Sequence, residues 1–484
     1  SDYLNMPDGR FEIYGYDGKR WLIDSIHESQ AAALIRCEEI ADDFRSGFEI
    51  IQVRDQQKFS GHAAVVHEQT CATGVAKPIR MQPVQEVSYC EQLIDYYAIS
   101  ARLVLSRLLR GFLDDERITA LELMHDYTRL RRLMRDDRLY PMALSHVATL
   151  QAKTAGIPAH KRSTEIDAAI EKIIKRAKNN HAYAGLTEML EREGISAAYA
   201  ALPKDHSSAR KRVDLAGAVA RHLRAYTEWD DKLSALLDLA AHAHEGDSFA
   251  VIDEAAAEIL DGQEAVGSLL GTIPELSDKL VARIELARGF WHGANDNASE
   301  VLNVSGQEKS QTAPSPVSYR LSHHLANETW THVPAVLMRQ VTKTLYGTTP
   351  LRRQRREEPE GFQDILKALA SVGGLAGGSE MVDAVTRRAR VVYGDAYENL
   401  PPKSAVEKVL GRLQPRSAQI GYLLALAASP FGRKYRSIMI ESLTEALKGL
   451  SSRQDLLAEG RSESETKSMM RELYAHISAL EAEM

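Results

Sequence analysis

The fold is decided by residues 232–287, which read KLSALLDLAAHAHEGDSFAVIDEAAAEILDGQEAVGSLLGTIPELSDKLVARIELA. Apolar residues recur there at intervals of three and four, the period of an α-helix with one buried face. Three such faces follow one another: Leu233, Leu236, Leu237, Ala240 and His244; Ile252, Ala255, Ala256, Ile259 and Leu260; and Leu276, Leu280, Ile284 and Ala287. Gly246 and Asp247 separate the first two, and Gly271 and Pro274 precede the third, as in helical hairpins with short connections. We therefore predict that these helices pack on one another.

Composition extends this prediction to most of the chain. With 484 residues, the chain is long enough for several domains. Hydrophobic residues make up 44% and charged residues 26%, close to the average of globular proteins, whereas aromatic residues make up only 6%. Few aromatic residues favour helix over strand. The predicted fold is mainly α, with a small N-terminal α+β domain of order ββαβ followed by irregular multi-helical domains built from helical hairpins.

The strand signals lie near the start of the sequence. Residues 11–16 and 19–26 flank an Asp17-Gly18 pair, which is typical of a tight hairpin turn. Ser29 is a candidate cap for a following helix, and residues 48–53 resemble a third strand. One helix covers only one face of such a sheet, so we expect the other face to meet the helical body or a partner.

Breaks in the pattern suggest the domain boundaries. We predict a small acidic ββαβ domain at 1–58, a linker or strap at 59–87, a helical domain at 88–291, a flexible linker at 292–317 and a second helical domain at 318–484. The segment 292–317 is predicted to be flexible because Gly, Asn, Ser and Pro replace the helical pattern there.

Charge and cysteine content limit the classes of function. The formal net charge is -7, and residues 1–60 hold 7 Lys or Arg against 12 Asp or Glu, so the chain is not a globally basic nucleic-acid binder. The three cysteines are too few for a disulfide framework, which favours a reducing compartment. The longest apolar run, 420–428, is too short to span a bilayer, and no signal peptide is evident. We therefore expect a cytoplasmic protein without a membrane span.

Common catalytic and ligand-binding motifs are missing from the sequence. There is no phosphate-binding G-x-x-x-x-G-K-[ST], no G-x-S-x-G and no H-E-x-x-H, and the glycine cluster at 373–378 is interpreted as a helix break. His62, His67 and Cys71 lack the paired spacing of a zinc site, and His242 and His244 diverge on a helix. We therefore predict no catalytic residue, no cofactor and no metal site.

Two groups of arginines are candidate sites for an anionic partner. Arg131, Arg135 and Arg138 are spaced at i, i+4 and i+7, so they would share one face if a helix continued through them. The denser group is Arg352, Arg353, Arg355 and Arg356. Acidic residues lie near both groups, so a surface of solvated or internally paired charges is the competing interpretation.

These observations favour a non-enzymatic regulatory or scaffold protein that binds other proteins through helical grooves and the N-terminal sheet module. The second hypothesis is binding of nucleic acid or a phosphorylated ligand through the arginines, although nucleic acid is the less expected partner. A third is an enzyme whose site is assembled from scattered residues. A C-terminal helix at 462–484 carries a seam at Met470, Leu473, Ile477 and Leu480, which either forms a homo-oligomer or packs on its own domain.

Overall fold

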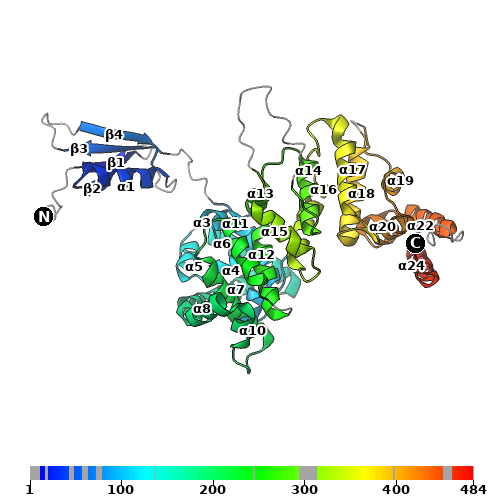
Figure 1. The fold of residues 1–484 in the computed structure, drawn as a ribbon, viewed down its shortest axis with the longest axis horizontal. Coiled ribbons are helices and arrows are strands. Elements are labelled where there is room, and N and C mark those ends of the chain that lie inside the picture. Colours follow the sequence, from blue (N-terminus) through cyan, green and yellow to red (C-terminus); the bar gives the residue numbers. More distant parts are fainter. Residues whose placement is uncertain are drawn as a thin grey trace. The chain divides into compact units, whose positions relative to one another are not determined.

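The chain folds into two compact units, Ser1–Arg80 and Met81–Met484. The computed structural model describes residues 11–16, 20–42, 48–56, 64–71, 79–136, 138–243, 246–293, 313–395, 398–450 and 460–482 (Figure 1). The described residues are mainly helical, with a four-stranded antiparallel sheet in the first unit. This confirms the predicted fold class.

The first unit is a sheet with one helix on it. Its elements are β1 (Phe11–Tyr16), β2 (Trp21–His27), α1 (Gln30–Asp42), β3 (Ile50–Asp55) and β4 (Ala64–Thr70), and the strand order is β2-β1-β3-β4. The predicted hairpin is present, because β1 and β2 pair with Tyr16 opposite Trp21. Its turn, at residues 17–19, lies outside the described residues. The Ser29 hydroxyl accepts the backbone N–H of Ala32 at 3.2 Å near the start of α1, as predicted.

The sheet has one strand more than the sequence predicted. The third strand begins at Ile50, and β4 forms within residues 59–87, where we expected only a linker or strap. The order is therefore ββαββ, and the first unit extends beyond residue 58. Side chains of α1 such as Cys37 pack on Ile13 and Ile51, which covers one face of the sheet (Figure 1).

The described part of the second unit consists mainly of helices, many of them joined by short connections. Two-residue strands β5 (Ala370–Ser371) and β6 (Gly374–Leu375) form a small hairpin at the predicted helix break. The helices are η1 (Leu93–Tyr97), α2 (Ile99–Leu108), α3 (Arg110–Glu116), α4 (Ala120–Met124), α5 (Tyr127–Met134), α6 (Leu139–Ala155), α7 (Ala159–Lys178), η2 (Asn180–Tyr183), α8 (Ala184–Glu193), α9 (Ile195–Ala200), α10 (Ser208–Leu223), α11 (Trp229–Ala240), α12 (Asp247–Leu260), α13 (Gln263–Leu270), α14 (Leu276–Ala287), α15 (Pro316–Leu325), α16 (His332–Tyr346), η4 (Arg355–Glu357), α17 (Glu358–Leu369), α18 (Gly378–Val392), α19 (Pro402–Leu410), α20 (Arg416–Ala427), α21 (Pro430–Lys434), α22 (Arg436–Leu450) and α24 (Glu463–Ala482).

The stretch 232–287 lies at the centre of this unit, as its pattern indicated. The predicted faces of α11 and α12 are buried, although His244 lies outside the described residues. Two apolar cores meet here: Leu286 of α14 and Leu337 of α16 belong to one, whereas Leu280 and Val341 of the same two helices belong to the other. Both helices thus join the two cores.

Helix α12 is buried on its polar side as well as its apolar side. Glu254 accepts a hydrogen bond from Arg102 of α2 at 2.6 Å and another from Arg212 of α10. Glu258 accepts the backbone N–H of Leu121 at 2.8 Å, and its other oxygen lies 3.0 Å from Arg102 Nε. Arg102 and Glu258 are both 1% exposed, so α2 and α4 are joined to α12 away from water, whereas Arg212 of α10 is 36% exposed.

The helices before and after the predicted linker pack into one unit. Asp253 of α12 accepts the backbone N–H groups of Thr331, His332 and Val333, at 2.8, 2.9 and 3.0 Å, and so caps the first turn of α16. The compact unit Met81–Met484 thus holds helices from both sides of the predicted linker. Most of the segment 292–317 lies outside the described residues.

The C-terminal helix α24 packs on its own unit. Leu473 and Leu480 are buried in the second core, and Met470 and Ile477 lie partly buried against it. The seam seen in the sequence is therefore covered within the chain, as one of the two interpretations expected. No described helix is both long and apolar enough to cross a membrane.

The buried carboxyl of Glu258 leads to a prediction about pH. Burial raises its pKa from 4.5 to about 7, against the opposing effect of Arg102. Between these two values the folded chain keeps a proton that the unfolded chain has released, so this group stabilises the fold fully below pH 4.5, and that contribution is lost as the pH rises through 7. Glu258→Gln removes this dependence. Measured by urea unfolding, the free energy of unfolding of the variant relative to wild type should rise by about 1–3 kcal/mol between pH 5 and pH 8. Glu407→Gln, at an exposed position, should show no such rise. A pH profile unchanged by Glu258→Gln would contradict the prediction.

Candidate functional site

The face of the sheet opposite α1 is the strongest candidate for a binding site. Side chains alternate along a strand, so Tyr14 and Tyr16 point away from the core that Ile13 enters. Pairing places Ile23 of β2 and Gln52 of β3 beside Tyr14 on this face. We call it the open sheet face and define it by Glu12, Tyr14, Tyr16, Trp21, Ile23, Gln52, Arg54, Val65 and Glu68.

Aromatic and aliphatic side chains form the apolar part of the open sheet face. The rings of Tyr16 and Trp21 lie 5.3 Å apart, and the guanidinium carbon of Arg54 lies 4.1 Å from the centre of the Tyr14 ring. Ile23 is 47% exposed and Val65 is 49% exposed. These two aliphatic residues lie on the edge strands β2 and β4, so the apolar surface extends across the sheet.

A row of hydrogen bonds fixes the polar side chains of this face. Gln52 donates to Glu68 at 2.6 Å and accepts two hydrogen bonds from Arg54, at 3.1 and 2.9 Å. The Tyr14 hydroxyl donates to Glu12 at 2.8 Å, and this bond raises the pKa of Tyr14. Because these rotamers are held within the chain, binding at this face would lose little side-chain entropy.

The first arginine group does not form the predicted helical face. Helix α5 ends at Met134, so the three arginines do not lie on one continuous helix. The Asp136 carboxylate accepts the backbone N–H groups of Arg138 and Leu139, at 2.9 and 2.7 Å, and begins α6 there. Arg131 is partly buried, whereas Arg135 and Arg138 are exposed on either side of this break.

The second arginine group lines a recess that also contains acidic residues. Arg352, Arg353 and Arg355 lie around a space of about 410 Å³, together with Glu358, Asp395 and Glu398.

Each of these three arginines already has a partner in the chain. Arg352 lies 2.9 Å from Asp278, Arg353 lies 3.6 Å from Glu275, and Arg355 donates to the carbonyl oxygen of Asp395. Arg356, 80% exposed, lies 3.8 Å from Glu357. The structure thus brings three of the four arginines together, but their charge is largely balanced.

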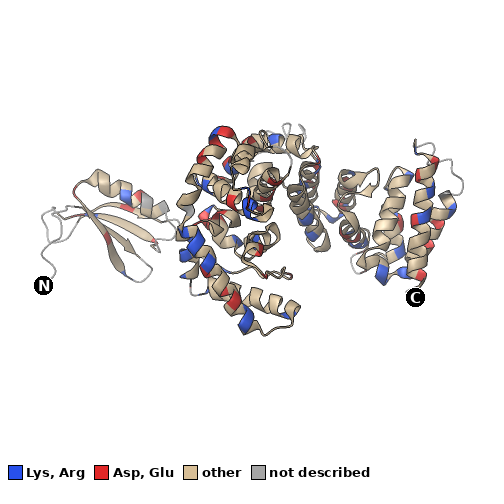
Figure 2. Cartoon of the chain, turned by 90° about the horizontal axis from the view of Figure 1, so that it is seen from below, with Lys and Arg blue, Asp and Glu red and all other residues tan. Residues whose placement is uncertain are grey.

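Elsewhere on the described helices, basic and acidic side chains are also mixed. Basic and acidic residues alternate along them rather than gathering by sign (Figure 2). Within the described residues no group of three or more His, Cys, Asp or Glu is placed to hold a metal ion, and His62 and His244 lie outside those residues.

The sequence predicted three of the four strands and a sheet face that the helix leaves uncovered, but not the side chains that form this face. The signal that could have identified them was the alternation of Phe11 and Ile13 with Tyr14 and Tyr16. No family model, no curated protein and no solved structure matches this chain significantly.

Proposed function

We propose that this chain is a non-enzymatic regulatory or scaffold protein of the cytoplasm that binds a protein partner through the open sheet face. The observation that carries the proposal is a preorganised aromatic surface with exposed aliphatic residues at both edges. Exposed apolar patches next to polar rims are typical of protein interaction sites. Aromatic residues and arginine also contribute most strongly to binding energy at such sites.

The chemistry of the face suggests the kind of partner. The aromatic residues of the face would be covered by apolar side chains of a partner. Glu12 and Glu68 lie on the same face. The balance of charge in residues 1–60 is negative as well. A partner segment with apolar side chains flanked by Lys or Arg would therefore match both the surface and the charge.

Surfaces of the helical unit give weaker support for the proposed helical grooves. Its most exposed apolar side chains are Val372, Tyr474 and Met142, which belong to separate segments and are 70%, 58% and 56% exposed. Single exposed residues of this kind are ordinary on protein surfaces. The alternative function, binding of nucleic acid or a phosphorylated ligand through the arginines, is less well supported because Arg352, Arg353 and Arg355 are already paired.

Two matched variants test the proposal. Ile23 on the open sheet face and Ile35 on the outer side of α1 are 47% and 60% exposed, so aspartate at either position disturbs little packing. We expect the full-length chain to bind its partner, measured by quantitative co-purification from the native host, and Ile23→Asp to weaken binding by about 30-fold or more, the effect of losing a hot spot. Ile35→Asp should bind like wild type.

The opposite result would reject this face. If both variants retain the partner, or if Ile35→Asp alone loses it, the open sheet face is not the binding site. Partner binding that survives Ile23→Asp but falls steeply with salt and with alanine at Arg352, Arg353, Arg355 and Arg356 would favour the alternative function.

A further inference from the structure

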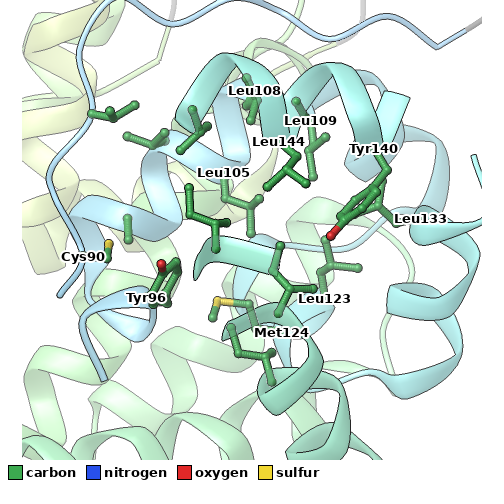
Figure 3. A pocket seen from close by; sticks show the side chains of 18 of the residues that line it. Cys90, Tyr96, Leu105, Leu108, Leu109, Leu123, Met124, Leu133, Tyr140 and Leu144 are labelled. Carbon is green, nitrogen blue, oxygen red and sulfur yellow. The ribbon is translucent and has the colours of Figure 1, made fainter. Parts of the chain in front are cut away.

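An apolar cavity lies inside the helical unit. It has a volume of about 140 Å³ and lies among α2, α4, α5, α6, α7 and the segment that precedes η1. Figure 3 shows Leu105, Leu123, Leu133 and Leu144 pointing into it from different helices. Leu105 and Leu144 are only half-buried, although both line the interior of a helix cluster.

The polar groups in the wall of the cavity are already bonded to other parts of the chain. Tyr140 donates to Asp167 at 2.5 Å, and Tyr96 accepts from Arg162 at 3.1 Å. Gln151 donates to the Ser88 carbonyl at 2.7 Å and accepts from Arg162 at 2.8 Å. A water molecule needs two to four polar partners, which this wall does not supply, so an apolar occupant is favoured over water.

The outer wall is a segment held down by hydrogen bonds, which we call the strap and define as residues 81–91. The backbone N–H of Gln82 donates to the Leu108 carbonyl at 3.0 Å, and the Cys90 carbonyl accepts from Arg162 at 2.6 Å. Val87, Ser88 and Cys90 of the strap line the cavity, and Cys90 is labelled in Figure 3. The strap is further held by His146, which bonds the Val84 backbone, and by Gln151, which donates to the Ser88 carbonyl.

We propose that this cavity binds a small apolar molecule of the size of a single aromatic ring or a branched chain of about six carbons. Dry apolar cavities of about 150 Å³ hold benzene, and the present volume is close to that size. A ligand of this size restores the dispersion contacts that the leucines around an empty space lack. This site is separate from the open sheet face and does not depend on the proposed function.

A cavity-filling variant provides the test. Ala143 of α6 lines the cavity, and Ala168 of α7 is exposed, so Ala143→Leu fills the space and Ala168→Leu is the matched control. Benzene should raise the Tm of the wild-type chain and of Ala168→Leu, because a ligand that binds only the folded state stabilises it. Ala143→Leu should bind benzene at least about tenfold more weakly, since the added atoms occupy the ligand's space.

A second readout on the wild-type chain covers the case in which Ala143→Leu does not fold. Cys90 is a buried thiol in the cavity wall, whereas Cys37 and Cys71 belong to the first unit. Benzene should slow alkylation of Cys90, measured by mass spectrometry, and leave Cys37 and Cys71 unchanged. Decanoate, whose chain exceeds the cavity, should protect less well.

Several results would overturn the assignment. Benzene that changes neither the Tm nor the alkylation of Cys90 would show that the cavity takes no such ligand. Equal binding by a folded Ala143→Leu variant would place the ligand elsewhere. Stronger protection by decanoate than by benzene would reject the proposed size.

Discussion

Replacing Arg102 by methionine should lower the free energy of unfolding by about 3–5 kcal/mol, the cost of leaving buried charges without a partner. Arg102 is 1% exposed and lies 2.6 Å from Glu254 and 3.0 Å from Glu258. Glu254 keeps Arg212, but in the variant Glu258 keeps only the backbone N–H of Leu121. Urea unfolding of the full chain, followed by circular dichroism, measures the loss.

A double variant separates charge from packing. Arg102→Met combined with Glu258→Met removes both charges and leaves two flexible apolar side chains that can fill the space. We expect it to recover a large part of the stability lost in Arg102→Met. A single variant as stable as wild type, or a double variant less stable than the single one, would show that these charges do not hold α2 against α12.

The second large effect is expected at Asp253, where alanine should cost about 2–4 kcal/mol. Its carboxylate accepts three backbone N–H groups at the start of α16 and a fourth hydrogen bond from the Thr331 hydroxyl at 3.1 Å. Asp253 is 2% exposed, so water does not replace these bonds freely. Alanine leaves buried donors of the first helical turn without an acceptor.

Asparagine at the same position is the matched control. Asp253→Asn keeps the shape and one carbonyl oxygen, so it should retain more of the stability than Asp253→Ala. Hydrogen exchange locates the effect, because Asp253→Ala should speed exchange of the α16 amides at residues 332–346. Unchanged exchange there would mean that α12 does not support α16.

Local signals explain which parts of the fold the sequence predicted. The hairpin of β1 and β2, the Ser29 cap and the apolar faces of α11, α12 and α14 depend on residues close together in the chain. Alternation and helical periodicity are visible in such short stretches. The strand β4 was missed because glycine and proline at Gly61, Gly74 and Pro78 dominate its surroundings.

Long-range pairing explains much of what the sequence could not show. Glu254 of α12 is buried and accepts a hydrogen bond from Arg102, which lies 152 residues away in the chain. Lys232 likewise pairs with Glu122 at 2.5 Å, with both side chains 1% exposed. Asp253 of α12 likewise accepts the backbone N–H of His332 in α16, 79 residues further along the chain.

The candidate site was only partly accessible from sequence for the same reason. The arginines were found because they are close together in the sequence. Their surroundings were not: α5 ends at Met134, between the arginines of the first group, and acidic residues lie around Arg352. The open sheet face depends on the register that places Tyr14 beside Ile23 and Gln52. The cavity depends on side chains from several helices at once, which no local pattern encodes.

Site-specific photo-crosslinking in the native host shows whether the open sheet face contacts another protein. A photoreactive benzoylphenylalanine is placed at Ile23 on that face and, as a matched control, at the similarly exposed Ile35 on α1. We expect one discrete adduct with a second protein from position 23 and none from position 35. Crosslinks from position 23 that reach only residues of the same chain, or an adduct that forms only from position 35, would contradict the proposed contact.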